Sequence, residues 1–150
     1  MDKEVSAKSF LREHKLSCLK IKTLEKKIEE LYGSDVRSPQ GSDGQPRGSG
    51  TGDPAGALAA KIADMRSETE WLWDQQQKIR RKIERTLYMM TDPDAFQVAW
   101  LRYIELEDWQ QIAEELDKTV RTVQRIHKKS LLEVQEILDK QRQEQTDYKL

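Results

Sequence analysis

The sequence has few of the features that cross-link a protein or attach it to a membrane. Its single cysteine, Cys18, cannot form a disulfide within the chain and has no second cysteine with which to hold a metal ion. No apolar run approaches the roughly 20 residues that a membrane-spanning helix requires, and the first residues lack the apolar core of a secretory signal. These absences predict an untargeted cytoplasmic protein with no membrane partner.

Residues typical of catalytic, metal and cofactor sites are also scarce. His14 and His127 are the only histidines, and no glycine-rich segment leads into a helix in the form that holds phosphates. No nucleophile, base and orienting group form a recognisable set. The sequence therefore predicts no enzyme, no metal site and no cofactor, and we interpret His127 as a residue of the surface or of the edge of a groove.

Glycine and proline are confined almost entirely to one segment. All seven glycines and three of the four prolines lie within residues 33–56, where apolar residues are rare. Such a composition cannot offset the entropy lost on ordering the backbone. We therefore expect a disordered linker over residues 33–56, between an N-terminal arm, residues 1–32, and a longer body.

Amphipathic helices are predicted on both sides of this linker. In the arm, four apolar residues recur with the 3,4,3 spacing of a coiled coil: Ile21, Leu24, Ile28 and Leu31. In residues 57–91, six apolar residues share one heptad grid: Leu58, Ile62, Met65, Leu72, Ile79 and Ile83. The two stripes would bury each other as an antiparallel pair within the chain or would pair between subunits, and the sequence alone does not choose.

Charge is sorted along the chain, although the net charge is only −1. Residues 105–117 contain six acidic residues and no lysine or arginine, whereas residues 118–129 contain five basic residues and no acidic one. A second basic cluster lies within residues 78–85, and we interpret it as the solvent side of a long helix in preference to a phosphate clamp. The weak net charge therefore does not exclude a nucleic-acid partner.

Three helices are predicted within residues 92–140. Asp92 before Pro93 is a typical helix start, Asp108 with Gln111 forms a capping box, and Thr119 can cap the third helix. The inner faces of the second and third helices are apolar: Trp109, Ile112, Ala113 and Leu116, then Val123, Ile126, Leu131 and Val134. With residues 141–150 expected as a polar tail, the whole chain is predicted to be all-α.

The third helix and its surroundings resemble a known DNA-binding motif. The string IAEELDKTVRTVQRI resembles the helix-turn-helix of bacterial regulators, and QVAWLRYIELEDWQQIA before it resembles the preceding helix of sigma-factor region 4. The string HKKSLLEV is similar to the C-terminal continuation of that region. With its paired N-terminal helices and linker, the chain as a whole resembles the small sigma-like regulators of phages of Gram-positive bacteria, of the ArpU and RinA kind.

This resemblance implies a function and a set of partners. The expected activity is sequence-specific binding to double-stranded DNA, in order to regulate the transcription of phage genes, commonly late ones, in the cytoplasm of the bacterial host. RNA polymerase, and a second copy of the chain bound through the N-terminal helices, are the further expected partners.

The resemblance also implies which residues bind DNA and which pack. The positions that contact DNA in such motifs are Thr119, Val120, Arg121, Gln124, Arg125 and Lys128, and the packing positions are Ile112, Ala113, Leu116, Val123 and Ile126. The turn departs from the pattern, because Asp117 stands where glycine is usual and Lys118 where an apolar residue is usual. Aspartate tolerates left-handed backbone better than most residues, so the turn is expected to form with Lys118 pointing outward.

Two other functions are compatible with these patterns. A DNA-packaging recognition subunit of the small-terminase kind also joins a helix-turn-helix to coiled-coil helices, but it assembles into rings. A structural coiled-coil adaptor would use the same helices without touching DNA. The mass of the assembly and the response to added duplex separate these functions from that of a regulator.

Overall fold

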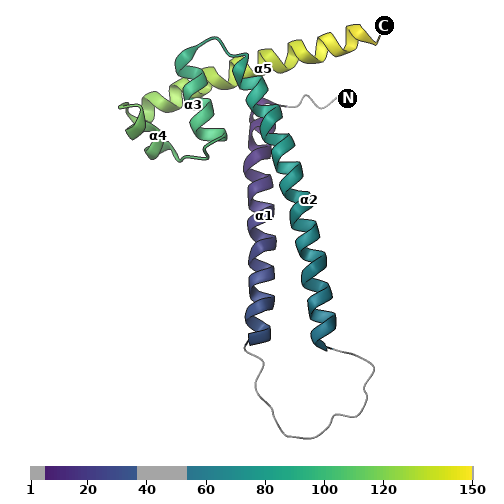
Figure 1. Cartoon of the computed structure of the whole chain (residues 1–150). Coiled ribbons are helices and arrows are strands. Elements are labelled where there is room, and N and C mark those ends of the chain that lie inside the picture. Colours follow the sequence, from purple (N-terminus) through teal and green to yellow (C-terminus); the bar gives the residue numbers. More distant parts are fainter. Residues whose placement is uncertain (1–5, 37–53, 150) are drawn as a thin grey trace, which may run out of the picture. The chain divides into compact units, whose positions relative to one another are not determined.

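A computed structural model describes residues 6–36 and 54–149 of the chain, with the side chains of residues 34–36 left undescribed. Five helices and no strand make up these residues (Figure 1). They are α1 (Ala7–Val36), α2 (Pro54–Tyr88), α3 (Pro93–Tyr103), α4 (Trp109–Glu115) and α5 (Val120–Tyr148). The predicted all-α class is confirmed for the described part of the chain.

The helices form two compact units, and the boundary between the units crosses α1 and α2. The larger unit comprises residues 1–17 and 76–150, and the smaller unit comprises residues 18–75. The first turns of α1 and the last turns of α2 therefore belong with α3, α4 and α5. The predicted domains instead kept each long helix separate from the helices of residues 92–140.

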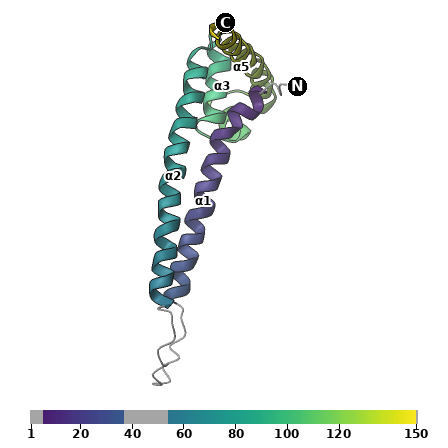
Figure 2. The ribbon, with the colours of Figure 1, turned by 90° about the vertical axis from the view of Figure 1, so that its right-hand side faces the viewer.

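In the smaller unit, α1 and α2 lie side by side and run in opposite directions (Figure 2). Ile21 and Ile62 from the two predicted stripes are buried, and the other stripe residues of this unit are half-buried. Near the end of α1, the Tyr32 ring lies 5.2 Å from the Arg66 guanidinium carbon, and Arg66 donates a hydrogen bond to the tyrosine hydroxyl. Of the two arrangements left open by the sequence, the structure shows the antiparallel pair within one chain.

Both helices extend into the predicted linker, so its bounds of 33 and 56 are wrong. The last turn of α1 runs through Gly33 to Val36, and α2 begins at Pro54. Proline suits the first turn of a helix, where its missing N–H has no partner to lose. A Cβ atom added at Gly33 would meet nothing within 4 Å, so this glycine lowers helix propensity without marking a tight turn. The rest of the predicted linker, residues 37–53, lies outside the described residues.

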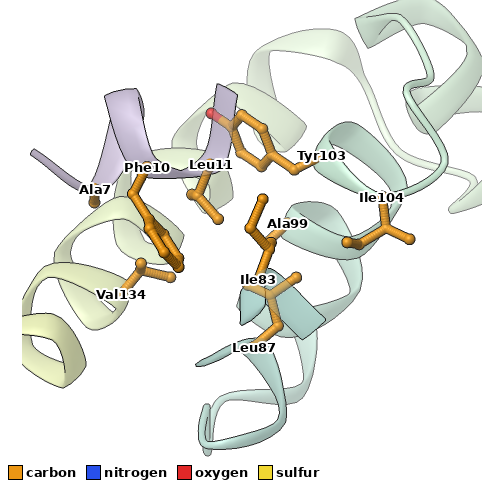
Figure 3. Packing of buried hydrophobic residues seen from close by; sticks show 9 residues of the cluster. All are labelled: Ala7, Phe10, Leu11, Ile83, Leu87, Ala99, Tyr103, Ile104 and Val134. Carbon is orange, nitrogen blue, oxygen red and sulfur yellow. The ribbon is translucent and has the colours of Figure 1, made fainter. Parts of the chain in front are cut away.

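The larger unit has a core to which four helices contribute (Figure 3). Its buried apolar residues come from α1, α2, α5 and the end of α3: Ala7, Phe10, Leu11, Ile83, Leu87, Ala99, Tyr103, Ile104 and Val134. Leu11, Ile83 and Leu87 are fully buried, and burial of each contributes about 1.5–3 kcal/mol. The start of α1 is thus held against the rest of the unit, and its Ala7 N–H donates to Gln135 Oε1 of α5 at 2.8 Å.

The last helix is longer than predicted. Residues 141–148, expected as a polar tail, continue α5 to Tyr148. Most of their side chains are exposed, so packing does not impose the helix. The segment is rich in glutamine, arginine and glutamate, which have high intrinsic helix propensity. Tertiary contact persists as far as Gln141, whose amide donates to the Met89 sulfur at 3.4 Å.

Candidate nucleic-acid interface

The helices α3, α4 and α5 form a compact three-helix framework around a second cluster of buried residues. These are Val98, Leu101, Ile112, Ala113 and Val123, with Trp109, Leu116, Val120 and Ile126 half-buried against them. The predicted packing residues are therefore all in this cluster. The small side chain of Ala113 lies where α4 packs on α5, which allows the two helices to approach closely.

All three predicted helix starts are confirmed by their hydrogen bonds. The Asp92 carboxylate accepts two backbone N–H bonds in the first turn of α3, at 3.0 and 3.2 Å. Asp108 and Gln111 form the reciprocal capping box of α4, at 2.8 and 2.9 Å. Thr119 Oγ1 accepts the Thr122 N–H at the start of α5, at 3.2 Å. Each cap contributes about 1 kcal/mol and determines where its helix begins.

The turn between α4 and α5 forms despite its unusual residues. Asp117 adopts a left-handed backbone with φ of 52°. The Lys118 N–H then donates to the Ala113 carbonyl at 2.9 Å, and the Asp117 N–H donates to the Glu114 carbonyl at 3.3 Å. This is the hydrogen-bond pattern of a Schellman motif, which ends α4 and directs the chain into α5. Lys118 is exposed, as expected.

Four of the six predicted DNA-binding residues share one exposed face of α5. They are Arg121, Gln124, Arg125 and Lys128, and we call them the recognition surface. Their spacing of i, i+3, i+4 and i+7 places them on one side of the helix. Across residues 6–36 and 54–149, no hydrogen bond or ion pair joins these four side chains to other protein groups. Their donors therefore point to solvent.

The other two predicted residues have structural roles at the start of α5. Thr119 is exposed, but its hydroxyl accepts from the Thr122 N–H and donates to the Thr122 hydroxyl at 2.9 Å. Val120 is half-buried against the second cluster, so its predicted exposure is wrong. The first turn of α5 lies close to α4, which leaves this side chain between the helices.

A ring cluster that the sequence analysis missed lies behind the recognition surface. His127 Nε2 is 2.5 Å from the Tyr103 hydroxyl, and its ring meets the Trp109 ring edge-on at 4.7 Å between centroids. On Trp109 lies the Arg102 guanidinium, 4.3 Å from the ring centroid. These contacts link α3, α4 and α5. His127 is half-buried, so of its two predicted positions an open surface position is wrong, and the edge of a groove stays a prediction.

The environment of this cluster keeps the side chains of His127 and Tyr103 uncharged near neutral pH. Burial, together with the nearby cations Arg102, Lys8 and Arg12, lowers the pKa of His127 to about 4. Burial also raises the pKa of Tyr103 above its usual value of 10.0. The hydrogen bond between the two rings therefore joins neutral partners.

Ser130 is a second residue whose role the sequence analysis did not identify. It is fully buried, and its hydroxyl donates to the Ala95 carbonyl of α3 at 2.7 Å. The bond ties α5 to α3 one helical turn before Val134. The signal was present in the sequence, because Ser130 follows Val123 by seven residues on the inner face of the helix.

Acidic side chains are concentrated on the helix that precedes α5. Glu114 and Glu115 of α4 and Asp117 of the turn are exposed. Burial raises the pKa of Glu107, as do the neighbouring carboxylates of Glu115, Glu105 and Asp108. The exposed charges of α4 and the turn are therefore mostly negative, whereas those of the first turns of α5 are positive.

The chain matches no known protein-family model, no curated protein and no solved structure. None of the described helices combines the length and the apolar character needed to cross a bilayer.

Proposed function

We propose that the protein is a sequence-specific regulator of transcription that binds double-stranded DNA by placing α5 in the major groove. The observation that carries this proposal is the recognition surface, Arg121, Gln124, Arg125 and Lys128. These side chains are exposed, have no partners among the described residues and project from a three-helix framework with a well-formed turn.

The residue types on this surface suit the edges of base pairs. The major groove is about 12 Å wide, which admits one α-helix. Arginine binds guanine through two parallel hydrogen bonds, and glutamine binds adenine in a similar way. Arg125 lies one turn beyond Arg121 and Gln124 lies between them, so three potential readers follow one another along the groove. Lys128 comes a further turn along, where the helix leaves the groove, and is suited to a backbone phosphate.

The resemblance to sigma-like phage regulators supports a role in transcription. Such regulators control phage genes, and the resemblance covers the helix-turn-helix, the α3 segment before it and the continuation of α5. We propose on this basis that the protein acts on phage genes in the bacterial cytoplasm and contacts RNA polymerase. A sigma-like mode of binding requires no symmetric operator.

A packaging subunit of the small-terminase kind is the second candidate. Trp71 and Trp73 on α2 of the smaller unit are 60% and 45% exposed. Two residues apart on a helix, they project to different sides, as would suit a subunit that has a neighbour on each side. A ring assembly would bury them. The mass of the protein bound to DNA separates the two functions, because the regulator predicts no closed ring and the packaging subunit requires one.

The proposal is tested by selecting bound sequences from a pool of random duplexes. The full chain should enrich one short motif over successive rounds. The exposed Lys140 lies further along α5, away from the recognition surface. Lys140→Ala removes a positive charge from the same helix and is the control, which should enrich the same motif as the parent. Duplexes retained without any enriched motif would contradict sequence-specific binding, and no retention at low salt would favour the adaptor.

A further inference from the structure

The larger unit has a second basic surface, formed by the last turns of α2 beside α5. A cavity of about 330 Å³ there is lined by Lys78, Arg81, Lys82, Arg85 and Thr86 of α2 and by Gln141 of α5. We call it the α2–α5 pocket. The basic residues of this segment were predicted to lie on the solvent side of the helix, and the four that line the pocket are exposed, as predicted.

The lining of the pocket suits a phosphate-bearing ligand. Four of its six residues are cations, and none is acidic or aromatic. Glu84, the acidic residue of this segment, is paired with Arg80 at 2.8 Å. The Lys82 ammonium lies 5.7 Å from the centroid of the Phe10 ring, a contact that favours one position of this cation at the edge of the pocket. The potential of the pocket is therefore positive.

The shape of this positive surface favours a run of phosphates over a single one. Lys78, Arg81, Lys82 and Arg85 recur at i, i+3, i+4 and i+7, which forms one stripe along α2. At 1.5 Å per residue the stripe is about 10 Å long. That length corresponds to roughly three steps of a nucleic-acid strand at 3.4 Å per step. Because no aromatic ring lines the pocket, it offers nothing on which the base of a free nucleotide could stack.

The pocket and the recognition surface lie on opposite sides of α5. Gln141 follows Arg125 by 16 residues, which places it about 24 Å further along the helix and about 160° around its axis. Gln141 also contacts Met89 beyond the end of α2, on the packed side of α5. One straight duplex that holds the recognition surface in its major groove therefore cannot reach the pocket as well.

We propose that the α2–α5 pocket binds the backbone phosphates of a second DNA duplex, without regard to its sequence. The protein would thereby hold two duplex segments at once, one read by α5 and one held by α2. The first of these contacts rests on the proposed function, whereas the pocket itself rests on its own lining and position.

The experiment measures how many short duplexes of scrambled sequence each chain binds at low salt, using the full protein attached to a surface. The parent should bind two duplexes per chain. Arg81→Glu with Arg85→Glu should weaken the binding of one of the two duplexes at least about tenfold, because two phosphate contacts become repulsive. The count per chain should then fall to one. The matched control reverses two exposed charges of the smaller unit, Lys26→Glu with Lys61→Glu, and should still bind two.

A recognition variant, Arg121→Glu with Arg125→Glu, whose reversed charges repel a duplex of any sequence, separates failure of this inference from failure of the proposed function. If the pocket variant still binds two duplexes, or if the parent binds one duplex that only the recognition variant loses, the pocket is not a DNA site. If binding is lost in the pocket variant and unchanged in the recognition variant, the pocket stands and the proposed function fails. Inorganic triphosphate should displace the pocket's duplex, and triphosphate bound there without any duplex would overturn the proposal.

Discussion

Single side chains behind the recognition surface determine how firmly α5 is held. His127 contacts Tyr103 and Trp109, and Ser130 donates to the Ala95 carbonyl. Both residues lie on the inner side of α5 within two turns of Arg125. A helix that reads bases must keep its side chains within a fraction of an ångström of their partners, and these contacts supply that support.

The His127 contact predicts how stability depends on pH. Burial lowers the pKa of this residue to about 4, whereas its pKa in the unfolded chain is about 6.5. Between these values the unfolded chain binds a proton that the folded chain does not. The contribution of neutral His127 to the free energy of unfolding is therefore fully present above about pH 6.5 and is lost as the pH falls toward 4. The loss is on the order of 2 kcal/mol once partial exposure is allowed for.

Thermal unfolding at about pH 7 and about pH 5 measures this effect. His127→Gln removes the titrating group, and the drop in melting temperature between the two pH values should be smaller in the variant than in the parent. His14, whose pKa is also lowered by burial and by Arg80, remains in both proteins and supplies the same residual drop. An equal drop in parent and variant would show that His127 is not protected from protonation in the folded chain.

At the scale of elements, the turn between α4 and α5 carries strain that a substitution can relieve. Asp117 has a φ of 52°, which glycine adopts without steric cost. We expect Asp117→Gly to stabilise the protein by about 0.5–1 kcal/mol, or roughly 1–4 °C in melting temperature. DNA affinity should be retained, because the hydrogen bonds of the turn involve only backbone groups. Asp117→Val, with a β-branched side chain, is the contrasting variant and should lower the melting temperature; equal effects of the two would contradict the strain.

The elements could be predicted from the sequence wherever a local signal determines them. Asp92, Asp108 and Thr119 marked three helix starts because capping depends on a side chain and its own first turn. Heptad spacing identified the stripes of α1 and α2 because burial repeats with the period of the helix. The end of α5 at Tyr148 was missed, since polar residues of high helix propensity carry no apolar signal.

In the candidate site, the features that follow from helix periodicity were predictable, and those that depend on packing between helices were not. Exposure of Arg121 and Arg125 follows from helix periodicity, and the structure confirms it. The partial burial of Val120 depends on how closely α4 approaches the first turn of α5, which is a tertiary property. The cavity beside Arg81 depends on α5 passing near α2, so charge along one helix could not reveal it.

At the scale of the whole molecule, the helix pair of the smaller unit should contribute to stability through its apolar stripes. Leu24 and Ile28 are half-buried on the stripe of α1. Leu24→Asp with Ile28→Asp places two charges between the helices, and each buried charge costs several kcal/mol unless the helices separate. We expect a lower melting temperature or an altered association state. Two exposed positions of the same helix, Lys22→Asp with Lys26→Asp, provide the control. If both properties of the stripe variant match those of the control, the stripes are not partners.

The central claim is that α5 reads DNA, and one titration tests it most directly. Arg125→Ala and Lys128→Ala are compared with the parent on the selected duplex and on a scrambled duplex, at several salt concentrations. Arg125→Ala should cost about 1–3 kcal/mol on the selected duplex and relax the preference for it. Lys128→Ala should weaken binding to both duplexes alike and reduce the salt slope by about one unit.

Val123→Asp is the structural control in this titration, because it buries a charge among α3, α4 and α5. It should unfold the framework and so weaken the binding of both duplexes. The account predicts that Arg125→Ala loses discrimination while remaining folded. If Arg125→Ala binds both duplexes as tightly as the parent and with the same preference, α5 is not the reader and the proposed function is wrong.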